Sequence, residues 1–299
     1  MTPRHPNQRS LASLPRELRR TSVPAPVRAW IERETGARIT RVARLAGASS
    51  AALHRVDLDN GTRLVLRRYV WRHYLDAEPD APAREVDALR FAFRHGLVVP
   101  EVVAVDLTGA TLGDGVPAIL MTHLRGRALA VPDFERLAET AAAIHAIPAT
   151  DLGHEYFPWY EDEMTTPPPR TRRPALWEEA IALWKAGLPR FRPTLIHRDF
   201  HPGNVLWSRG RMSGIVDWAA ACQGPIGCDL AHCRNNLRDL AGHAAADEFV
   251  ARYESATGEK LEPFWIMAGH LEHSHDHWTD ERLARDEDDL LAAFRAATG

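Results

Sequence analysis

The chain has 299 residues, of which 45% are hydrophobic and 26% are charged, and its formal net charge is -3 at pH 7. This length can bury the cores of two compact lobes, and the near-neutral charge without a basic stripe excludes nucleic acid as an expected partner. No apolar run reaches membrane-spanning length, and residues 1–22 are rich in Arg, Pro and Ser, so we expect a cytoplasmic protein with no membrane partner.

The first half of the chain alternates between strand and helix patterns. Asp59-Asn60-Gly61 joins two runs of apolar alternation, which predicts an antiparallel hairpin. Pro82 and Gly96 bound an apolar stripe at helical spacing, which predicts a helix. In chain order we expect a mobile basic tail over 1–22, a short amphipathic helix over 26–35, strands over 53–58 and 62–69, a helix over 82–96 and a buried strand over 117–126.

The second half is mostly helical in pattern. Helices are expected over 132–147 and 175–186 and again after Pro225, while 151–173, with several aromatics and three consecutive prolines, is expected to be a surface loop. The predicted fold class is therefore α+β. A small lobe over 23–124 holds an antiparallel sheet and a helix, and a larger helical lobe spans 125–299.

The segment 195–207 carries the most informative motif. His197, Asp199 and Asn204 match the kinase catalytic loop H-R-D-x-x-x-x-N. Phosphoryl transfer needs one carboxylate at the acceptor hydroxyl and oxygen ligands for magnesium. Asp199 is the candidate for the first role, and Asn204, beyond a bend at Pro202-Gly203, is the candidate for a metal ligand.

A second carboxylate follows in a predicted return strand. After the turn 208–211, the run 212–218 reads as the second strand of a hairpin and delivers Asp217 beside Asn204. Asn204 and Asp217 are the predicted Mg²⁺ ligands.

These motifs resemble the aminoglycoside phosphotransferase family. Its loop commonly reads H-x-D-x-H-P-x-N, followed by I-D-W and G-x-x-x-x-D-L-A, and the chain has His197 to Asn204, Val216-Asp217-Trp218 and Gly224 to Ala231 in that order. The resemblance implies a protein-kinase-like two-lobed fold and transfer of a phosphoryl group from ATP or GTP to a small hydroxylated acceptor. It also implies that Asp229 is a buried carboxylate that braces the catalytic loop. Asp217-Trp218-Ala219, in place of D-F-G, favours small-molecule kinases over protein kinases.

A kinase also requires a cation on its third strand. The two-residue period of a strand places Arg67 level with Val65, which is the position of the expected Lys. A guanidinium keeps the positive charge and forks onto phosphate oxygens, but it is longer and planar. Arg68 is expected to point the other way, toward solvent.

The predicted partner of this cation is Glu85, which adjoins the apolar stripe of the 82–96 helix. Asp87 is the alternative, and a first-turn carboxylate can also act only on the helix dipole.

Two further segments are candidates for nucleotide binding. Gly47, Ser49 and Ser50 lie in a small-residue loop that can approach phosphates, although alone it reads as a hairpin turn. Thr122 to Leu124 ends the buried strand and would offer backbone groups to adenine, and a strand that simply enters a loop is the alternative.

Cysteines and C-terminal histidines carry the remaining patterns. Cys222, Cys228 and Cys233 lack paired spacing, so reduced structural thiols are expected. His270, His273 and His277 share one helix face and could bind a transition metal. Acidic residues around these histidines suit either a cationic acceptor or a solvated helix face. These acids are Glu272, Asp276, Asp280 and Glu281.

Three hypotheses follow: a small-molecule kinase, a catalytically silent nucleotide-binding module, and a metal-binding protein built on the C-terminal histidines. Intact Asp199, Asn204 and Asp217 favour the first. In the resembling family, inserts such as 151–173 help form the acceptor pocket, whereas aromatics packed on the core are the alternative. The acceptor's identity and the oligomeric state do not follow from the sequence.

Overall fold

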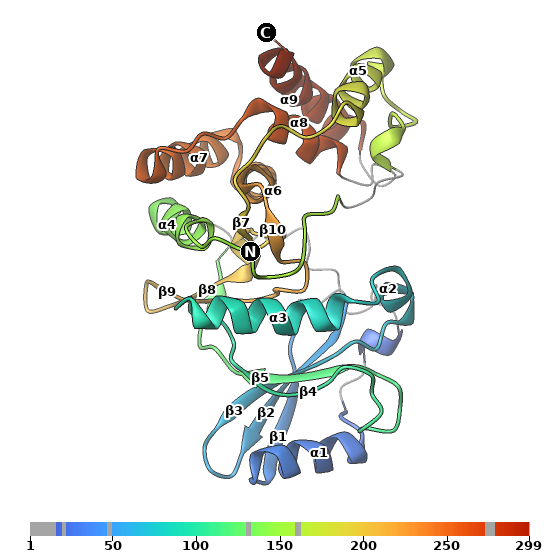
Figure 1. The fold of residues 1–299 in the computed structure, drawn as a ribbon, viewed down its shortest axis with the longest axis vertical. Helices are drawn as coiled ribbons and strands as arrows, with labels where there is room; N and C mark the ends of the chain where they lie inside the picture. The colour runs from blue at the N-terminus through green and yellow to red at the C-terminus, as the bar shows by residue number, and fades with distance from the viewer. Residues whose placement is uncertain are drawn as a thin grey trace. The chain divides into compact units, whose positions relative to one another are not determined.

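The computed structural model describes residues 16–19, 22–46, 50–129, 133–158, 163–272 and 279–298. It divides into two compact units (Figure 1). The first comprises Met1–Pro132 with Pro202–Ala221, and the second comprises Asp133–His201 with Cys222–Gly299. The segment after the predicted catalytic loop thus returns to the first unit, and the lobe boundary near Leu124 stays a prediction.

A five-stranded antiparallel sheet forms the centre of the first unit, in the order β1-β2-β3-β5-β4. The expected hairpin is present, with Arg67 paired to Leu53 on one side and to Ile119 on the other. The strands are β1 (Ile39–Arg44), β2 (Ala52–Leu58), β3 (Arg63–Arg68), β4 (Val102–Asp106) and β5 (Ala118–Thr122).

Two helices cover opposite faces of this sheet (Figure 1). On one face, α1 (Ala25–Thr35) packs Trp30 and Ile31 against a core that includes Leu64 and Leu66 of β3. On the other face lies α3 (Ala81–Arg94), which follows the short α2 (Arg72–Ala77). Alternation along β3 therefore gives its even-numbered apolar residues to the α1 core and turns Arg67 toward α3.

Part of the expected tail is packed. Arg16–Arg19 form the 3-10 helix η2, in which Leu18 is fully buried. Arg44 of β1 donates two hydrogen bonds to the Leu18 carbonyl, at 3.0 and 2.8 Å. Residues 1–15 and 20–21 lie outside the described residues.

A small second sheet belongs to the first unit. It contains β6 (Arg127–Ala128), β8 (Val205–Ser208) and β9 (Arg211–Ile215), with the 3-10 turn η4 (Pro202–Asn204) before β8. Gly214 is at φ +153°, a conformation that residues with a side chain rarely adopt, and a Cβ there would also crowd Leu124 Cδ1 and the Val98 carbonyl, so glycine is favoured where β9 passes Leu124.

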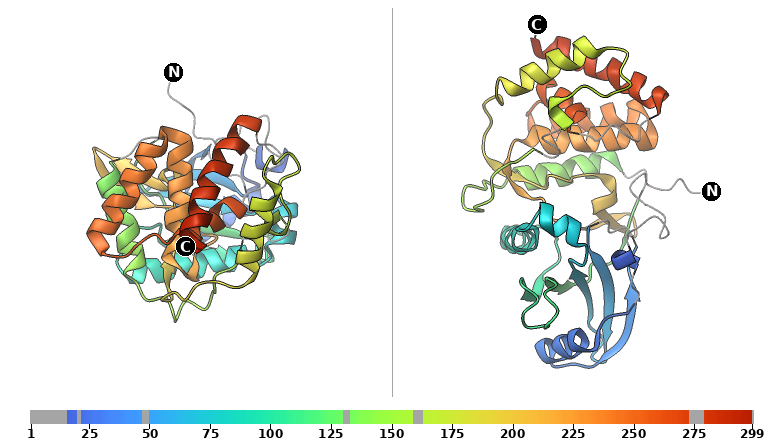
Figure 2. Two further views of the ribbon diagram at one scale, coloured as in Figure 1. Left: turned by 90° about the horizontal axis from the view of Figure 1, so that it is seen from above. Right: turned by 90° about the vertical axis from the view of Figure 1, so that its right-hand side faces the viewer.

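Helices dominate the second unit, as predicted. The strands β7 (Thr194–Ile196) and β10 (Cys222–Gly224) pair antiparallel in the second unit, and the predicted catalytic loop follows β7 in the chain. In the view from above, α5 (Pro174–Lys185) lies beside α9 (Asp280–Thr298) (Figure 2). Trp177 Nε1 of α5 donates a hydrogen bond to Glu287 Oε1 of α9. The helices are α4 (Phe134–His145), α5 (Pro174–Lys185), α6 (Ile226–Ala241), α7 (His243–Thr257), α8 (Pro263–Leu271) and α9 (Asp280–Thr298).

The segment 151–173, which contains the three consecutive prolines, has little regular structure. Its one helical turn in the described part is η3 (Glu163–Thr165), and 159–162 lie outside the described residues.

Cys222, Cys228 and Cys233 are buried thiols. No helix among the described residues is long and apolar enough to cross a membrane.

Candidate active site

The first unit brings the predicted cation and its acid together. Arg67 Nη1 donates to Glu85 Oε1 at 3.0 Å, and both side chains are almost fully buried. Tyr69 donates a second hydrogen bond to Glu85, at Oε2. Burial raises the pKa of Glu85, and the Arg67 charge opposes that rise. The contact thus involves Glu85, as expected, rather than Asp87.

The same guanidinium reaches Asp217, the predicted metal ligand. Arg67 Nη1 lies 2.6 Å from Asp217 Oδ1, whose side chain is 38% exposed. Burial acts to lower the pKa of Arg67, but Asp217 and Glu85 raise it above its ordinary value, so the group stays charged. One buried cation therefore joins α3 to the segment after β9.

The β8–β9 hairpin places Asn204 and Asp217 together. The backbone N–H of Val216 donates to the Asn204 carbonyl at 2.9 Å, which sets Asp217 one residue beyond the contact. Asp217 has a left-handed φ of 69°, and the chain then continues to Ala219, whose carbonyl accepts a 2.6 Å hydrogen bond from Arg84 of α3. These contacts fix the predicted metal ligands to the first unit.

The donor set of Asn204 and Asp217 fits magnesium. An amide oxygen and a carboxylate are hard oxygen ligands, and Mg²⁺ commonly uses one or two such protein groups together with phosphates and water. The ion pair with Arg67 also shows that the Asp217 carboxylate already binds a cation at this position. Within the described part of the chain, no group of three or more His, Cys, Asp or Glu side chains could hold a metal by itself.

The other predicted nucleotide contacts are partly described. Ser50 Oγ accepts a hydrogen bond from Arg67 Nη2 at 3.3 Å, whereas Gly47 and Ser49 lie outside the described residues. At the end of β5, the N–H of Thr122 donates to Glu101 and that of His123 donates to Arg63. Leu124 follows and packs over Gly214.

One expectation for this strand is wrong. Arg68 does face away from Arg67, but it is 5% exposed and pairs with Asp114 instead of pointing into solvent. The face opposite α3 carries the α1 core, so a side chain on that face is buried along with it.

The second unit holds Asp199 among histidines. His232 Nε2 lies 3.0 Å from Asp199 Oδ1, and His201 Nε2 lies 3.7 Å from the same oxygen. Burial alone would raise the pKa of Asp199, but His201, His232 and His197 lower it below its ordinary value. Asp199 is thus an ionised carboxylate whose side chain is 28% exposed.

Asp229 braces the loop as the resemblance implies. It is fully buried in the first turns of α6 and accepts the backbone N–H groups of His197 and Arg198, each at 2.7 Å. His145 of α4 contacts Asp229 Oδ2 at 3.2 Å and Tyr253 of α7 at 2.8 Å. Burial raises the pKa of Asp229, but hydrogen bonding to His145 and the charges nearby lower it below its ordinary value.

Arg198 anchors the loop on its other side. Its backbone is left-handed, at φ 69°, and its buried guanidinium bonds Glu272 at 2.6 Å and the Phe157 carbonyl at 3.1 Å. Tyr156 donates to Glu272 at 2.9 Å and stacks under the guanidinium. Glu272 is therefore a buried partner of Arg198 and not part of a solvated helix face.

The C-terminal histidine pattern is only partly described. His270 is buried and lies 3.0 Å from Asp289, which Arg234 and Arg238 also contact. His273, His275, Asp276 and His277 lie outside the described residues.

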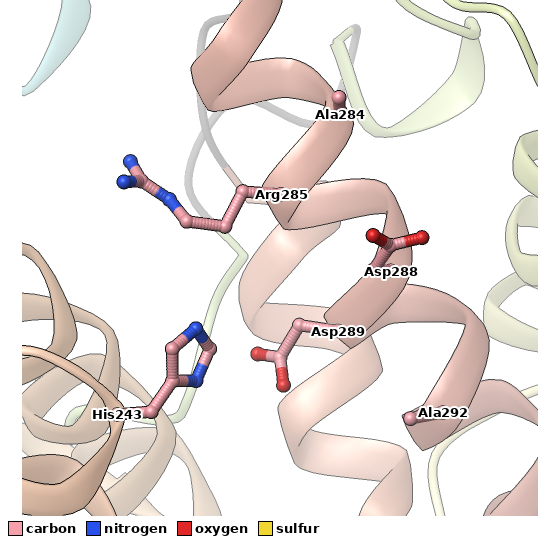
Figure 3. Close-up of a pocket in the computed structure, with 6 residues that line it drawn as sticks. All are labelled: His243, Ala284, Arg285, Asp288, Asp289 and Ala292. Atoms are coloured by element: carbon pink, nitrogen blue, oxygen red, sulfur yellow. The ribbon is translucent and has the colours of Figure 1, made fainter.

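A cavity of about 490 Å³ opens beside this cluster, where His243 and Arg285 extend from α7 and α9 (Figure 3). None of the predicted site residues lines it.

His232 is the site residue that the sequence analysis missed. It stands three residues after Asp229, so both lie on one face of α6. The three-residue spacing is visible in the sequence, but it points to His232 only once Asp229 is known to face the loop.

The sheet with its buried Arg-Glu pair, the braced Asp199 loop and the Asn204-Asp217 hairpin define the class of protein-kinase-like phosphotransferases. Residues 40–264 match the model of the phosphotransferase enzyme family, and the chain belongs to that family.

Solved structures share this fold. A mutant of aminoglycoside phosphotransferase APH(4)-Ia, in complex with ADP and hygromycin B, is 18% identical, with a TM-score of 0.63 over 92% of this chain and 100% of its own. Amicoumacin kinase hAmiN, in complex with AMP-PNP, Ca²⁺ and Ami, is 13% identical, with a TM-score of 0.60 over 89% and 92% of the two chains.

Curated relatives are homoserine kinases. Those of Beijerinckia indica and Gluconacetobacter diazotrophicus are each 31% identical, over 48% and 47% of this chain and 49% of their own length. The chain thus spans about half the length of the curated relatives it matches.

Proposed function

We propose that the protein transfers the γ-phosphoryl group of ATP or GTP to a hydroxyl of a small molecule. The observation that carries the proposal is Asp199, a partly exposed carboxylate that is kept ionised and sits on a braced loop. Such a group can orient an acceptor hydroxyl and take its proton as the oxygen attacks phosphorus.

The first unit supplies the groups for the nucleotide. Arg67 would steady the phosphates and Glu85 would orient Arg67, with Ser50 and the neighbouring Gly47 and Ser49 near the phosphates and Thr122 to Leu124 near the base. Asn204 and Asp217 would hold Mg²⁺, which neutralises charge on the phosphates when bound. Arg67 Nη1 contacts Oδ1 of Asp217, so Mg²⁺ held by Asp217 would share this carboxylate with Arg67.

The acceptor is a small hydroxylated molecule. The relatives' names include an amino-acid kinase, an aminoglycoside phosphotransferase and an amicoumacin kinase, all of which are small-molecule enzymes. Choice of acceptor depends on loops that differ between such proteins. The cytoplasmic location stays a prediction.

Substitution of Asp199 tests the proposal. We expect Asp199→Ala to lower turnover by about 10²–10⁴-fold, the usual contribution of a positioned acid or base, while nucleotide affinity stays unchanged. Product mass after incubation with hydroxylated acceptors, including homoserine and aminoglycosides, measures turnover, and calorimetry measures nucleotide binding. Wild-type turnover in the variant would contradict the role of Asp199. Nucleotide binding by the wild type without product from any acceptor would favour the silent module.

A further inference from the structure

His232 lies on the same face of α6 as Asp229, the residue that braces the loop. Asp229 and His232 are three residues apart on α6, so they project from successive turns. Asp229 holds the loop backbone at His197 and Arg198, and His232 reaches the Asp199 side chain at 3.0 Å. A single helix face thus controls both the path of the loop and the carboxylate that the loop carries.

We propose that His232 is a positioning residue that fixes the rotation of the Asp199 carboxylate for phosphoryl transfer. The proposal rests on the proposed function. His232 would not contact the acceptor itself; it would act through Asp199.

Two imidazoles, of His232 and of His201, contact the same oxygen of Asp199, Oδ1, and such contacts restrain the rotation of its carboxylate. Terminal carboxylate torsions are broad and nearly two-fold when nothing restrains them. Holding Oδ1 against α6 therefore determines where Oδ2 lies, and Oδ2 is the oxygen we assign to the acceptor hydroxyl. Preorganised geometry of this kind lowers a barrier without any new contact to substrate.

The same contact determines where the proton goes. In the transfer, the acceptor O–H bond breaks as the new O–P bond forms, and the bond from phosphorus to the leaving nucleoside diphosphate breaks. Nε2 of His232 lies 3.0 Å from Asp199 Oδ1, and we assign the hydrogen of the neutral imidazole to this nitrogen because it faces a carboxylate oxygen. That nitrogen then has no lone pair for a second proton, so the acceptor proton passes to Asp199 and not on to His232.

A purely structural role for His232 makes different predictions. Its side chain is 14% exposed and could simply fill space on α6. A space-filling role would lower thermal stability and leave the turnover of the folded protein intact. A positioning role lowers kcat at unchanged stability.

The experiment compares His232→Leu, His232→Gln and the matched control His243→Leu, whose histidine lines the cavity of Figure 3. Outer-shell orienting partners typically contribute 10- to 100-fold, so we expect His232→Leu to lower kcat by about that factor. The KM for nucleotide should change by less than about twofold. Glutamine keeps a donor of similar reach and should restore most of the rate. The control should match the wild type.

A pH profile adds a second readout. Asp199 faces His197, His201 and His232, all of which lower its pKa. Removing His232 should move the acid limb of kcat/KM to higher pH, whereas the control should not move it. A His232→Leu protein with wild-type kcat and acid limb would overturn the proposal. So would a rate loss that glutamine does not restore.

A readout without turnover separates this proposal from the proposed function. Protein labelled with carbon-13 at the aspartate carboxyl carbons, with Asp199 assigned through Asp199→Asn, reports the titration of that carboxylate by NMR. His232→Leu should shift this titration to higher pH even if no acceptor has been found. An unchanged titration would overturn the proposal whatever the enzyme's activity.

Discussion

Arg67 is the residue on which the first unit's site depends. A single nitrogen, Nη1, contacts both Glu85 and Asp217, and Nη2 reaches Ser50. Because the group is buried, its two acids compensate its desolvation and it compensates theirs.

The first prediction concerns this residue. Arg67→Met should cost about 3–5 kcal/mol of unfolding free energy, because it leaves Glu85 buried without a cation. It should also weaken nucleotide binding, while Arg67→Lys keeps a charge and loses less of both. Denaturant unfolding and nucleotide calorimetry measure these effects. Arg68→Met is the matched control: it removes another buried guanidinium, whose partner Asp114 is partly exposed, but should leave nucleotide affinity intact. Wild-type nucleotide affinity in Arg67→Met would contradict the role assigned to Arg67.

The second prediction concerns Asp229 and pH. The pKa of Asp229 is lower in the folded protein than its ordinary value of about 4. Its hydrogen bonds therefore stabilise the fold at pH values above about 4, and this stabilisation is lost as the pH falls through the folded-state pKa. Asp229→Asn should lose about 3 kcal/mol or more at neutral pH, and the gap to the wild type should close in acid. Chemical unfolding across the pH range measures this gap. Asp247→Asn, at an exposed position on α7, should show no such gap. A difference in unfolding free energy between Asp229→Asn and the wild type that stays constant with pH would contradict the role of Asp229 in holding the loop.

The direction of a side chain could be predicted from the sequence where the repeat of a strand or helix, or a motif, defined it. Strand alternation placed Arg67 on the face that α3 covers, and the helix stripe selected Glu85 over Asp87. It failed for Arg68, because alternation tells which face a residue takes but not that α1 buries that face. His232 needed three-dimensional information about α6.

At the scale of elements, α6 connects packing to the site. Its second residue, Gly227, lies against Trp265 of α8, and a Cβ at Gly227 would lie only 2.1 Å from the indole Cδ1 and 2.8 Å from Trp265 Cβ. Asp229 follows two residues later. Any displacement of this turn would therefore also displace the brace on the catalytic loop.

The third prediction tests that packing. Gly227→Ala gains up to about 1 kcal/mol in helix propensity, but overpacking typically costs 1–3 kcal/mol. Because Trp265 is nearly buried and its backbone-proximal Cβ is involved, we expect a net loss of about 2 kcal/mol and lower turnover. Thermal unfolding and kcat measure the two effects. Gly269→Ala on α8 is the contrast, since its nearest neighbour is the Asn235 amide at 3.1 Å, which can move. Equal stability of both variants would show that α6 can shift freely.

Most elements could be predicted because their patterns are local. The β2–β3 and β8–β9 hairpins, α3 and the helices after Pro225 all follow from alternation, turns and caps. The return of the β8–β9 hairpin to the first unit could not be predicted, because it depends on contacts such as the hydrogen bond from Ile215 to Val98, more than a hundred residues away.

At the scale of the whole molecule, the chain segment with the kinase-like motif contributes residues to both units. Asp199 belongs to the second unit, and Asn204 and Asp217 belong to the first, so the chain crosses from one unit to the other within the motif. The family assignment covers both units, since residues 40–264 span them. The roles of the two units in binding nucleotide and acceptor stay a proposal.

The most direct measurement follows the phosphoryl group itself. Purified protein, magnesium and a nucleotide labelled with oxygen-18 on its γ-phosphoryl group are incubated with the acceptor panel, and the products are weighed by mass spectrometry. We expect an acceptor that gains one labelled phosphoryl group, and a labelling rate about 10²–10⁴-fold lower with Asp199→Ala. Labelled inorganic phosphate as the sole product, or label transfer at the wild-type rate in Asp199→Ala, would contradict the proposed transfer.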